Sequence, residues 1–183
     1  MNSTVITSFP ASLSPTVSRL LPLLDPPADL TPTFPCPVLC AGESFTIPSR
    51  IYSPVPNRLR IALFSGTEQP IVACWFTRHH DGYVRERFLR TLSAYDCAWV
   101  IAYVVALCGD YVVEILRCIW ERRSQFDRLT LGHWLRANEP FYSRTRSRIV
   151  SYWDCYYRSS FPRFGDYVGG QLLTFFDDCI INT

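Results

Sequence analysis

Residues 69–92 read QPIVACWFTRHHDGYVRERFLRTL, and this stretch decides the fold class. Its first part is apolar, its middle is polar, and its last part carries apolar residues on one side at helical spacing. Pro70 suits the first turn of a helix, and Asp81 is the type of residue that caps the start of the next one. The stretch therefore predicts two helices joined by a tight corner.

The same order of segments returns 28 residues further along the chain. The apolar run CAWVIAYVVALC at 97–108 is followed by GDYVVEILRCIWERR at 109–123. With this shift, Trp75 falls on Tyr103 and Tyr83 falls on Tyr111. Because the match runs through helix, turn and helix in one order, it favours a tandem of helical hairpins.

The corner Asp81-Gly82-Tyr83-Val84-Arg85 resembles the turn between helices in HEAT-like and armadillo-like repeats, over about residues 68–125. In those families an Asp precedes a Val-Arg pair that begins the inner helix. The second corner departs from this pattern, because Val113 stands where the arginine would be. The resemblance implies a short stack of helical hairpins and a ladder of hydrogen bonds between successive corners, here among Asp81, Arg85, Asp110 and Glu114. More loosely, residues 44–170 look like bacterial proteins of unknown role with TRHHDG and SYW-CYYR stretches, which implies no activity.

The flanking segments predict other structure. Residues 1–41 are rich in Pro, Ser and Thr, with eight prolines between positions 10 and 37, so we expect a partly disordered arm without a long helix. Residues 42–66 are β-like or extended and predict at most a short β-hairpin. Residues 129–183 predict further helices, the last of which buries Leu172, Leu173, Phe175 and Phe176. We therefore expect a mostly α protein with one helical domain over residues 42–183, built as a HEAT-like stack.

Composition excludes several classes of enzyme. All 18 basic residues are arginine, so Schiff-base, phosphate-loop and kinase-type lysines are absent. We attribute the arginine bias to coding composition; avoidance of lysine-directed tagging is the alternative. The net charge of +2 gives no strong overall attraction to nucleic acid or membrane. The longest apolar run has 12 residues where a bilayer span needs about 20.

The eight cysteines indicate a reduced, cytoplasmic protein. The N-terminal stretch lacks the pattern of a secretory signal. Most cysteines, Cys97 and Cys155 among them, fall in apolar segments, where a thiol behaves as a small buried hydrophobe. Cys36 and Cys40 are spaced C-x3-C without a second pair, so the spacing predicts no zinc site.

The adjacent His79, His80 and Asp81 are the candidate catalytic residues. Neighbouring side chains on a helix point about 100° apart, so both histidines cannot face one metal ion without a turn between them. We interpret the three residues as a helix end and its cap. A general base or a metal-assisted enzyme of unknown type is the alternative. We expect no metal and no cofactor.

A segment rich in arginine and aromatic residues, residues 141–163, is the candidate binding surface. Guanidinium groups beside aromatic rings suit protein hot spots, and they also suit nucleic-acid backbones and bases. The sequence therefore predicts a non-catalytic module that binds another protein or its own copy, with nucleic-acid binding as the alternative and no membrane partner. The residues assigned to this surface are Arg144, Arg146, Arg148, Tyr152, Tyr156 and Arg158.

Overall fold

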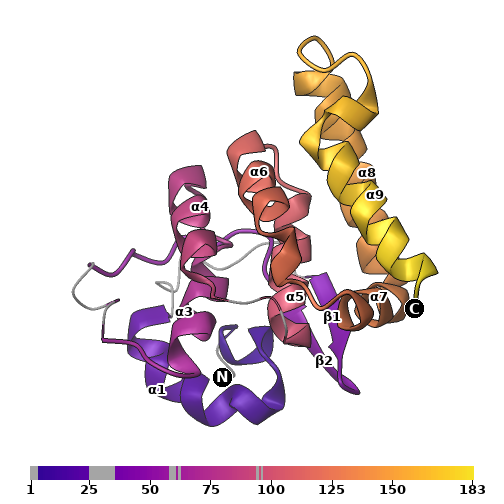
Figure 1. Ribbon diagram of the computed structural model, residues 1–183. Helices are drawn as coiled ribbons and strands as arrows, with labels where there is room; N and C mark the ends of the chain where they lie inside the picture. Colours follow the sequence, from indigo (N-terminus) through magenta and orange to yellow (C-terminus); the bar gives the residue numbers. More distant parts are fainter. Residues whose placement is uncertain (1–3, 25–35, 58–60, 62, 94, 96) are drawn as a thin grey trace. The chain divides into compact units, whose positions relative to one another are not determined.

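The structure is a computed structural model that describes residues 4–24, 36–57, 61, 63–93, 95 and 97–183. Most of these residues are helical, and two strands form a small antiparallel sheet (Figure 1), which confirms the mostly α prediction and its short hairpin. The chain forms two compact units, Met1–Ser93 and Ala94–Thr183. The predicted division into an arm of residues 1–41 and a helical domain of residues 42–183 stays a prediction.

The elements of the first unit are η1 (Ile6–Ser8), η2 (Ala11–Leu13), α1 (Ser14–Leu24), β1 (Cys36–Cys40), β2 (Glu43–Ile47), α3 (Glu68–Phe76) and α4 (Gly82–Thr91). Those of the second unit are α5 (Ala98–Cys108), α6 (Val113–Glu121), η3 (Arg123–Gln125), α7 (Arg128–Ala137), α8 (Glu139–Tyr152), the π-turn η4 (Trp153–Tyr157), η5 (Phe164–Asp166) and α9 (Val168–Ile181).

Where an extended arm was expected, residues 14–24 form helix α1, which packs against α3. Pro22 lies inside this helix, so one helical hydrogen bond is missing. Burial of Val17, Leu20 and Leu24 offsets that loss, because apolar side chains gain free energy when they leave water. Residues 25–35, also assigned to the arm, lie outside the described residues.

The sheet of the first unit is a tight hairpin. Strand β1 pairs with β2 in the register Cys36 to Ile47, and the two turn residues, Ala41 and Gly42, both have positive φ. This is the backbone that two-residue hairpin loops prefer. Strand β2 ends before Pro48, which has no N–H to donate to a sheet.

In the second unit, the most apolar helix is central. Helix α5 is buried over almost its whole length and contacts α6, α7 and α8. Helices α8 and α9 lie side by side, and α9 also packs on α6 and α7 (Figure 1). The packing of α7 against α9 is close, because a Cβ atom at Gly132 would collide with the carbonyl of Cys179.

Several details of the sequence prediction need correction. Helix α7 is capped by Asp127, whose carboxylate accepts a hydrogen bond from the Thr130 N–H at 2.7 Å. Cys97 and Cys155 are exposed, although their apolar surroundings predicted burial.

The hairpins α3–α4 and α5–α6 belong to different units, and a solenoid of helical repeats is not shown, so the stack stays a prediction. Within the described part of the chain, no helix has the length and apolarity needed to cross a bilayer.

Candidate functional site

The corner between α3 and α4 is held by an extended segment of the same unit. The backbone of Ile51 donates to the Arg78 carbonyl at 2.9 Å and accepts from the His80 N–H at 3.0 Å. The Arg78 side chain holds the residues that precede Ile51 in the extended segment. Its Nε donates to the Pro48 carbonyl at 2.9 Å and its Nη2 to the Ser49 carbonyl at 2.8 Å. The corner is therefore part of a strand-like bridge as well as a helix end.

Beneath this bridge lies the fully buried side chain of Arg85. Its Nη1 donates to the carbonyl oxygens of His79 and His80, both at 2.8 Å. These two carbonyls belong to the turn between α3 and α4. The guanidinium thus ties this turn to the first turn of the helix that follows, a structural use of the arginine.

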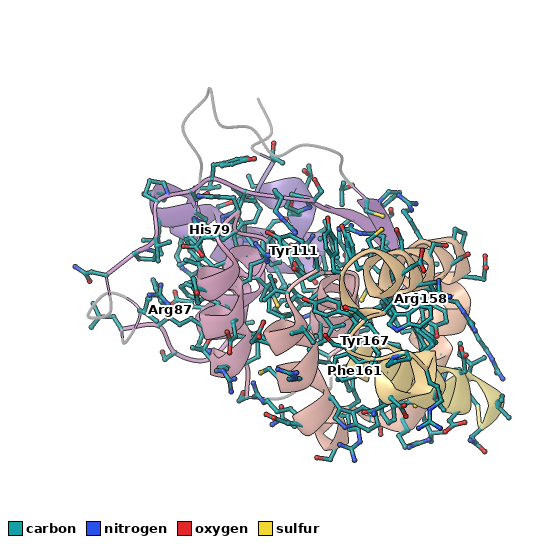
Figure 2. The ribbon with its side chains drawn as sticks, turned by 90° about the horizontal axis from the view of Figure 1, so that it is seen from above. His79, Arg87, Tyr111, Arg158, Phe161 and Tyr167 are labelled. Carbon is teal, nitrogen blue, oxygen red and sulfur yellow. The ribbon has the colours of Figure 1, made fainter. Side chains whose placement is uncertain are left out.

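The two histidines differ in exposure and in role. His79 is buried and its Nδ1 accepts from the Asp81 N–H at 3.1 Å, while His80 is exposed and stacks on Tyr52 with ring centroids 5.0 Å apart (His79 is labelled in Figure 2). Burial lowers the pKa of His79, and the neighbouring His80 lowers it further. The nearby carboxylate of Asp81 acts in the opposite direction. A neutral buried imidazole that accepts a backbone N–H is an element of the corner.

Asp81 caps α4, as predicted, by accepting the Tyr83 N–H at 2.9 Å. At the second corner, Asp110 accepts the Val112 N–H at 3.1 Å, so each aspartate bonds the residue two positions on. Glu114 is exposed and pairs with Arg117 at 3.9 Å. The two corners share this local turn, and the predicted ladder of hydrogen bonds between them stays a prediction.

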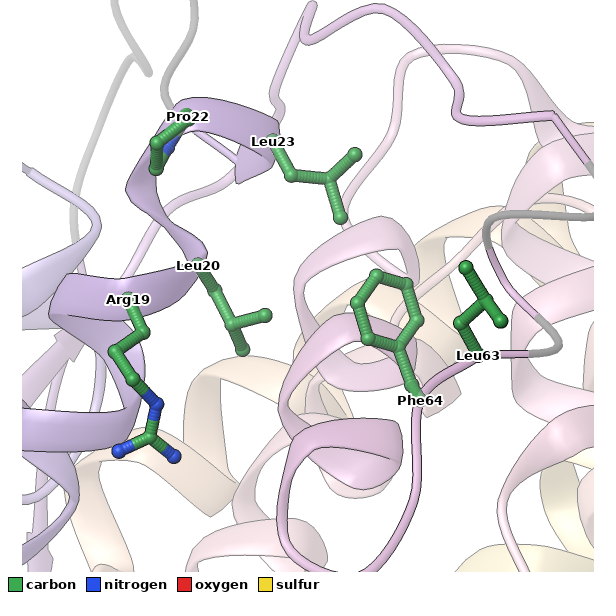
Figure 3. Close-up of a pocket in the computed structure, with 6 residues that line it drawn as sticks. All are labelled: Arg19, Leu20, Pro22, Leu23, Leu63 and Phe64. Carbon is green, nitrogen blue, oxygen red and sulfur yellow. The ribbon is translucent and has the colours of Figure 1, made fainter.

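Two cavities lie among the described residues, and neither is lined by His79 or His80. One cleft of about 230 Å³ in the first unit lies between α1 and residues 63–64 (Figure 3). An open groove of about 540 Å³ in the second unit lies along α8 and is lined by Arg146, Ser147, Val150, Ser151, Trp153 and Asp154. Among the described residues, no group of three or more His, Cys, Asp or Glu side chains is placed to hold a metal ion.

The predicted Arg and aromatic segment forms α8 and the π-turn that follows it. Its first aromatic residues, Phe141 and Tyr142, are buried in the core, whereas Tyr156 is 65% exposed. Tyr152 lies between Tyr111 and Tyr156, with ring centroids 6.1 Å from each. The segment thus changes from core to surface along its length.

Three arginines of this region are neutralised by their own carboxylates. Arg146 pairs with Asp177 at 3.2 Å, Arg158 with Asp154 at 2.7 Å, and Arg163 with Asp166 at 2.9 Å. Between residues 139 and 178 there are five arginines and five acidic residues, so the α8–α9 hairpin carries no net charge. A surface of this kind does not provide the excess positive charge that a phosphate backbone requires.

Arg144 and Arg148 differ from these three arginines. Within the described part of the chain, no carboxylate lies within ion-pair distance of either. The Arg148 Nη2 donates to the Tyr152 hydroxyl at 3.3 Å, and its guanidinium lies 5.8 Å from the centre of that ring. The predicted binding residues therefore separate into paired arginines and an Arg-Tyr group.

Sequence reasoning did not identify the residues that support this group. Tyr157 donates a hydrogen bond to the Tyr111 carbonyl at 2.6 Å and stacks on Tyr167 at 5.3 Å. Tyr167 is fully buried and also contacts Phe161 (both are labelled in Figure 2). The π-turn that aims Tyr157 inward leaves no periodic signal in the sequence, although such turns often mark functional positions.

Comparison of the chain with protein-family models, curated proteins and solved structures finds no match.

Proposed function

We propose that this protein is a non-catalytic protein-interaction module and that it binds through the exposed face of α8 and its π-turn. The observation that carries the proposal is the Tyr111, Tyr152 and Tyr156 cluster, which is exposed or half-buried yet fixed by contacts beneath it. Rigid aromatic side chains beside arginine are enriched at protein hot spots, because they bury much area at a small cost in side-chain entropy.

Electrostatics favours a protein partner over nucleic acid. Three of the five arginines in the α8–α9 hairpin already have carboxylate partners, and Asp154 and Asp177 flank the face. A nucleic acid brings closely spaced phosphates that these carboxylates would repel. Nucleic-acid binding is therefore the second candidate, and it rests only on the remaining arginines.

An enzymatic role for the histidine corner has less support. The buried His79 is occupied by a backbone N–H, and neither cavity described above is lined by it or by His80. A general base needs hydrogen-bond reach to a substrate in a cleft. The corner has the contacts of a structural joint.

A photo-crosslinking amino acid introduced at Tyr156 tests the proposal in cells that express the full chain. We expect adducts with a small, reproducible set of proteins, and we expect them to be lost when Tyr152 is replaced by Ala. The matched control places the crosslinker at Tyr83, which is 86% exposed in the first unit. Equal adducts from both positions, or nucleic acid as the main adduct at Tyr156, would contradict the proposal.

A further inference from the structure

Four side chains follow one another along α8 and the π-turn η4 at intervals of four residues: Arg144, Arg148, Tyr152 and Tyr156. Residues four apart share one side of an α-helix, with a rotation of about 40° at each step. Between Tyr152 and Tyr156 the chain enters the π-turn, which places more residues in each turn and reverses this rotation. The four side chains therefore form one continuous row, the Arg-Tyr stripe.

The two halves of the stripe have different chemistry. Arg144 is exposed and Arg148 is half-buried, and as shown above the described residues bring no carboxylate to either. Tyr152 and Tyr156 continue the row as an aromatic surface, and the hydrogen bond from Arg148 to Tyr152 joins the halves. Two available cations one helical turn apart are thus followed by two rings.

Charge complementarity indicates what fits this row. On a helix, side chains four apart are separated by about 6 Å at their Cβ atoms, so two carboxylates one turn apart on a partner helix, or two positions apart on an extended chain, match the two guanidiniums. Arginine binds carboxylates with directed, charge-assisted hydrogen bonds. Beyond them, the tyrosines offer area for an apolar or aromatic side chain.

We infer that the Arg-Tyr stripe binds an acidic segment of a partner protein, with two carboxylates on Arg144 and Arg148 and an apolar side chain on Tyr152 and Tyr156. This inference rests on the proposed function, since it names the partner chemistry of the same surface. Arg146, Arg158 and Arg163 are paired with carboxylates of this chain, so the positive charge open to a partner is confined to Arg144 and Arg148. The stripe therefore selects a partner segment by the spacing of its acidic residues as well as by their number.

Selection from a random peptide library displayed on phage, with the full chain immobilised, tests the inference. We expect the selected peptides to be enriched in pairs of Asp or Glu followed by an apolar or aromatic residue. A labelled peptide carrying that consensus should lose roughly 10-fold in affinity for the R144Q/R148Q variant in fluorescence anisotropy, because two charge pairs with the peptide are removed. Replacing its acids with Asn or Gln should weaken binding by a similar factor.

R146Q is the matched control, because Arg146 lies on the same helix and is already paired with Asp177. We expect it to change the affinity by less than about twofold. Arg144 is exposed and Arg148 is half-buried, so circular dichroism checks that the test variant is folded. A single-stranded oligonucleotide is the competing probe. Tighter binding of that probe with the same dependence on Arg144 and Arg148 would overturn the inference, as would selected peptides that lack acidic residues.

The outcomes separate this inference from the proposed function. Crosslinks at Tyr156 that persist in the R144Q/R148Q variant, together with selected peptides that are not acidic, would leave a protein-binding face but remove the acidic partner. Absence of specific crosslinks at Tyr156 would remove both.

Discussion

Tyr167→Phe should stabilise the protein. The Tyr167 side chain is fully buried in the second unit, packed against Tyr157, Phe161 and Phe164. Its hydroxyl has no hydrogen-bond partner among the described residues. Burial is the main cause that raises the pKa of this phenol above its ordinary value. The hydroxyl therefore gives up its hydration in the folded state without a bond in return.

The expected gain follows from two opposing terms. Burying a hydroxyl without a partner costs about 1 to 3 kcal/mol, and the void left by removing one oxygen atom costs about 0.5 kcal/mol. We expect a net stabilisation of about 1 to 2 kcal/mol, which for a chain of this length raises the melting temperature by roughly 2 to 4 °C per kcal/mol. Urea denaturation followed by tryptophan fluorescence measures the change in the free energy of unfolding. If the m-value is the same in both chains, a shift of the urea midpoint reports a change in stability.

Tyr142→Phe is the matched control, because it makes the same substitution in the same unit with the opposite expectation. The Tyr142 hydroxyl donates to the Asp177 carboxylate at 2.8 Å, and it is also buried. Losing a hydrogen bond to a charged acceptor should destabilise by about 1.5 to 3 kcal/mol. If Tyr167→Phe destabilises as much as this control, the Tyr167 hydroxyl has a partner such as a buried water, and the reasoning is wrong.

Three further outcomes are expected. Gly170→Ala should destabilise by about 1 to 3 kcal/mol in the same denaturation assay, because the new Cβ would collide with a backbone carbonyl of η5, while Gly165→Ala, with open space around it, should change little. Ala41→Asn should stabilise the first unit by about 0.5 to 1 kcal/mol, because Asn tolerates the φ of 50° at this turn better than Ala does; an unchanged or lower urea midpoint would contradict this. The pKa of His79 is lowered in the folded state, so the unfolded chain takes up a proton at this residue more readily. The contribution of His79 to the free energy of unfolding is therefore complete above the unfolded pKa of about 6.5 and is lost as pH falls below it. The stability deficit of His79→Gln relative to the parent chain should thus shrink between about pH 7.5 and pH 5, and a constant deficit would refute this linkage.

The sequence predicted those helices whose apolar spacing, turn residues and caps all lie within one short stretch of the chain. Helices α3 and α4 follow from an apolar run, a polar corner and the cap Asp81, all within 24 residues. A helix as long as α1 was not expected, because local reasoning on the prolines left out the packing of Leu20 and Leu24 in the core of the first unit. Packing between distant segments overrides local propensity, and its strength is not visible in one segment.

The candidate site shows the same limit. The stretch that contains the Arg-Tyr stripe was found, because its composition is unusual over a short span. The sequence did not show which arginines lack a carboxylate partner within the chain, because such partners can be distant in sequence. The partner of Arg146, for example, is Asp177, 31 positions away. The π-turn also lies beyond sequence reasoning, since it adds one residue to a turn without changing the type of residue used.

The two directed donors of Arg78 bear on the lysine-free composition of the chain. Its Nε and Nη2 reach two successive carbonyl oxygens, a geometry that the single ammonium group of lysine cannot reproduce in a buried place. Exposed arginines such as Arg87 impose no such demand. If coding composition drifted toward lysine codons, replacement would be accepted first on the surface, and position 78 would be among the last to change. A bias that began in the genome would then persist in the interior for reasons of geometry.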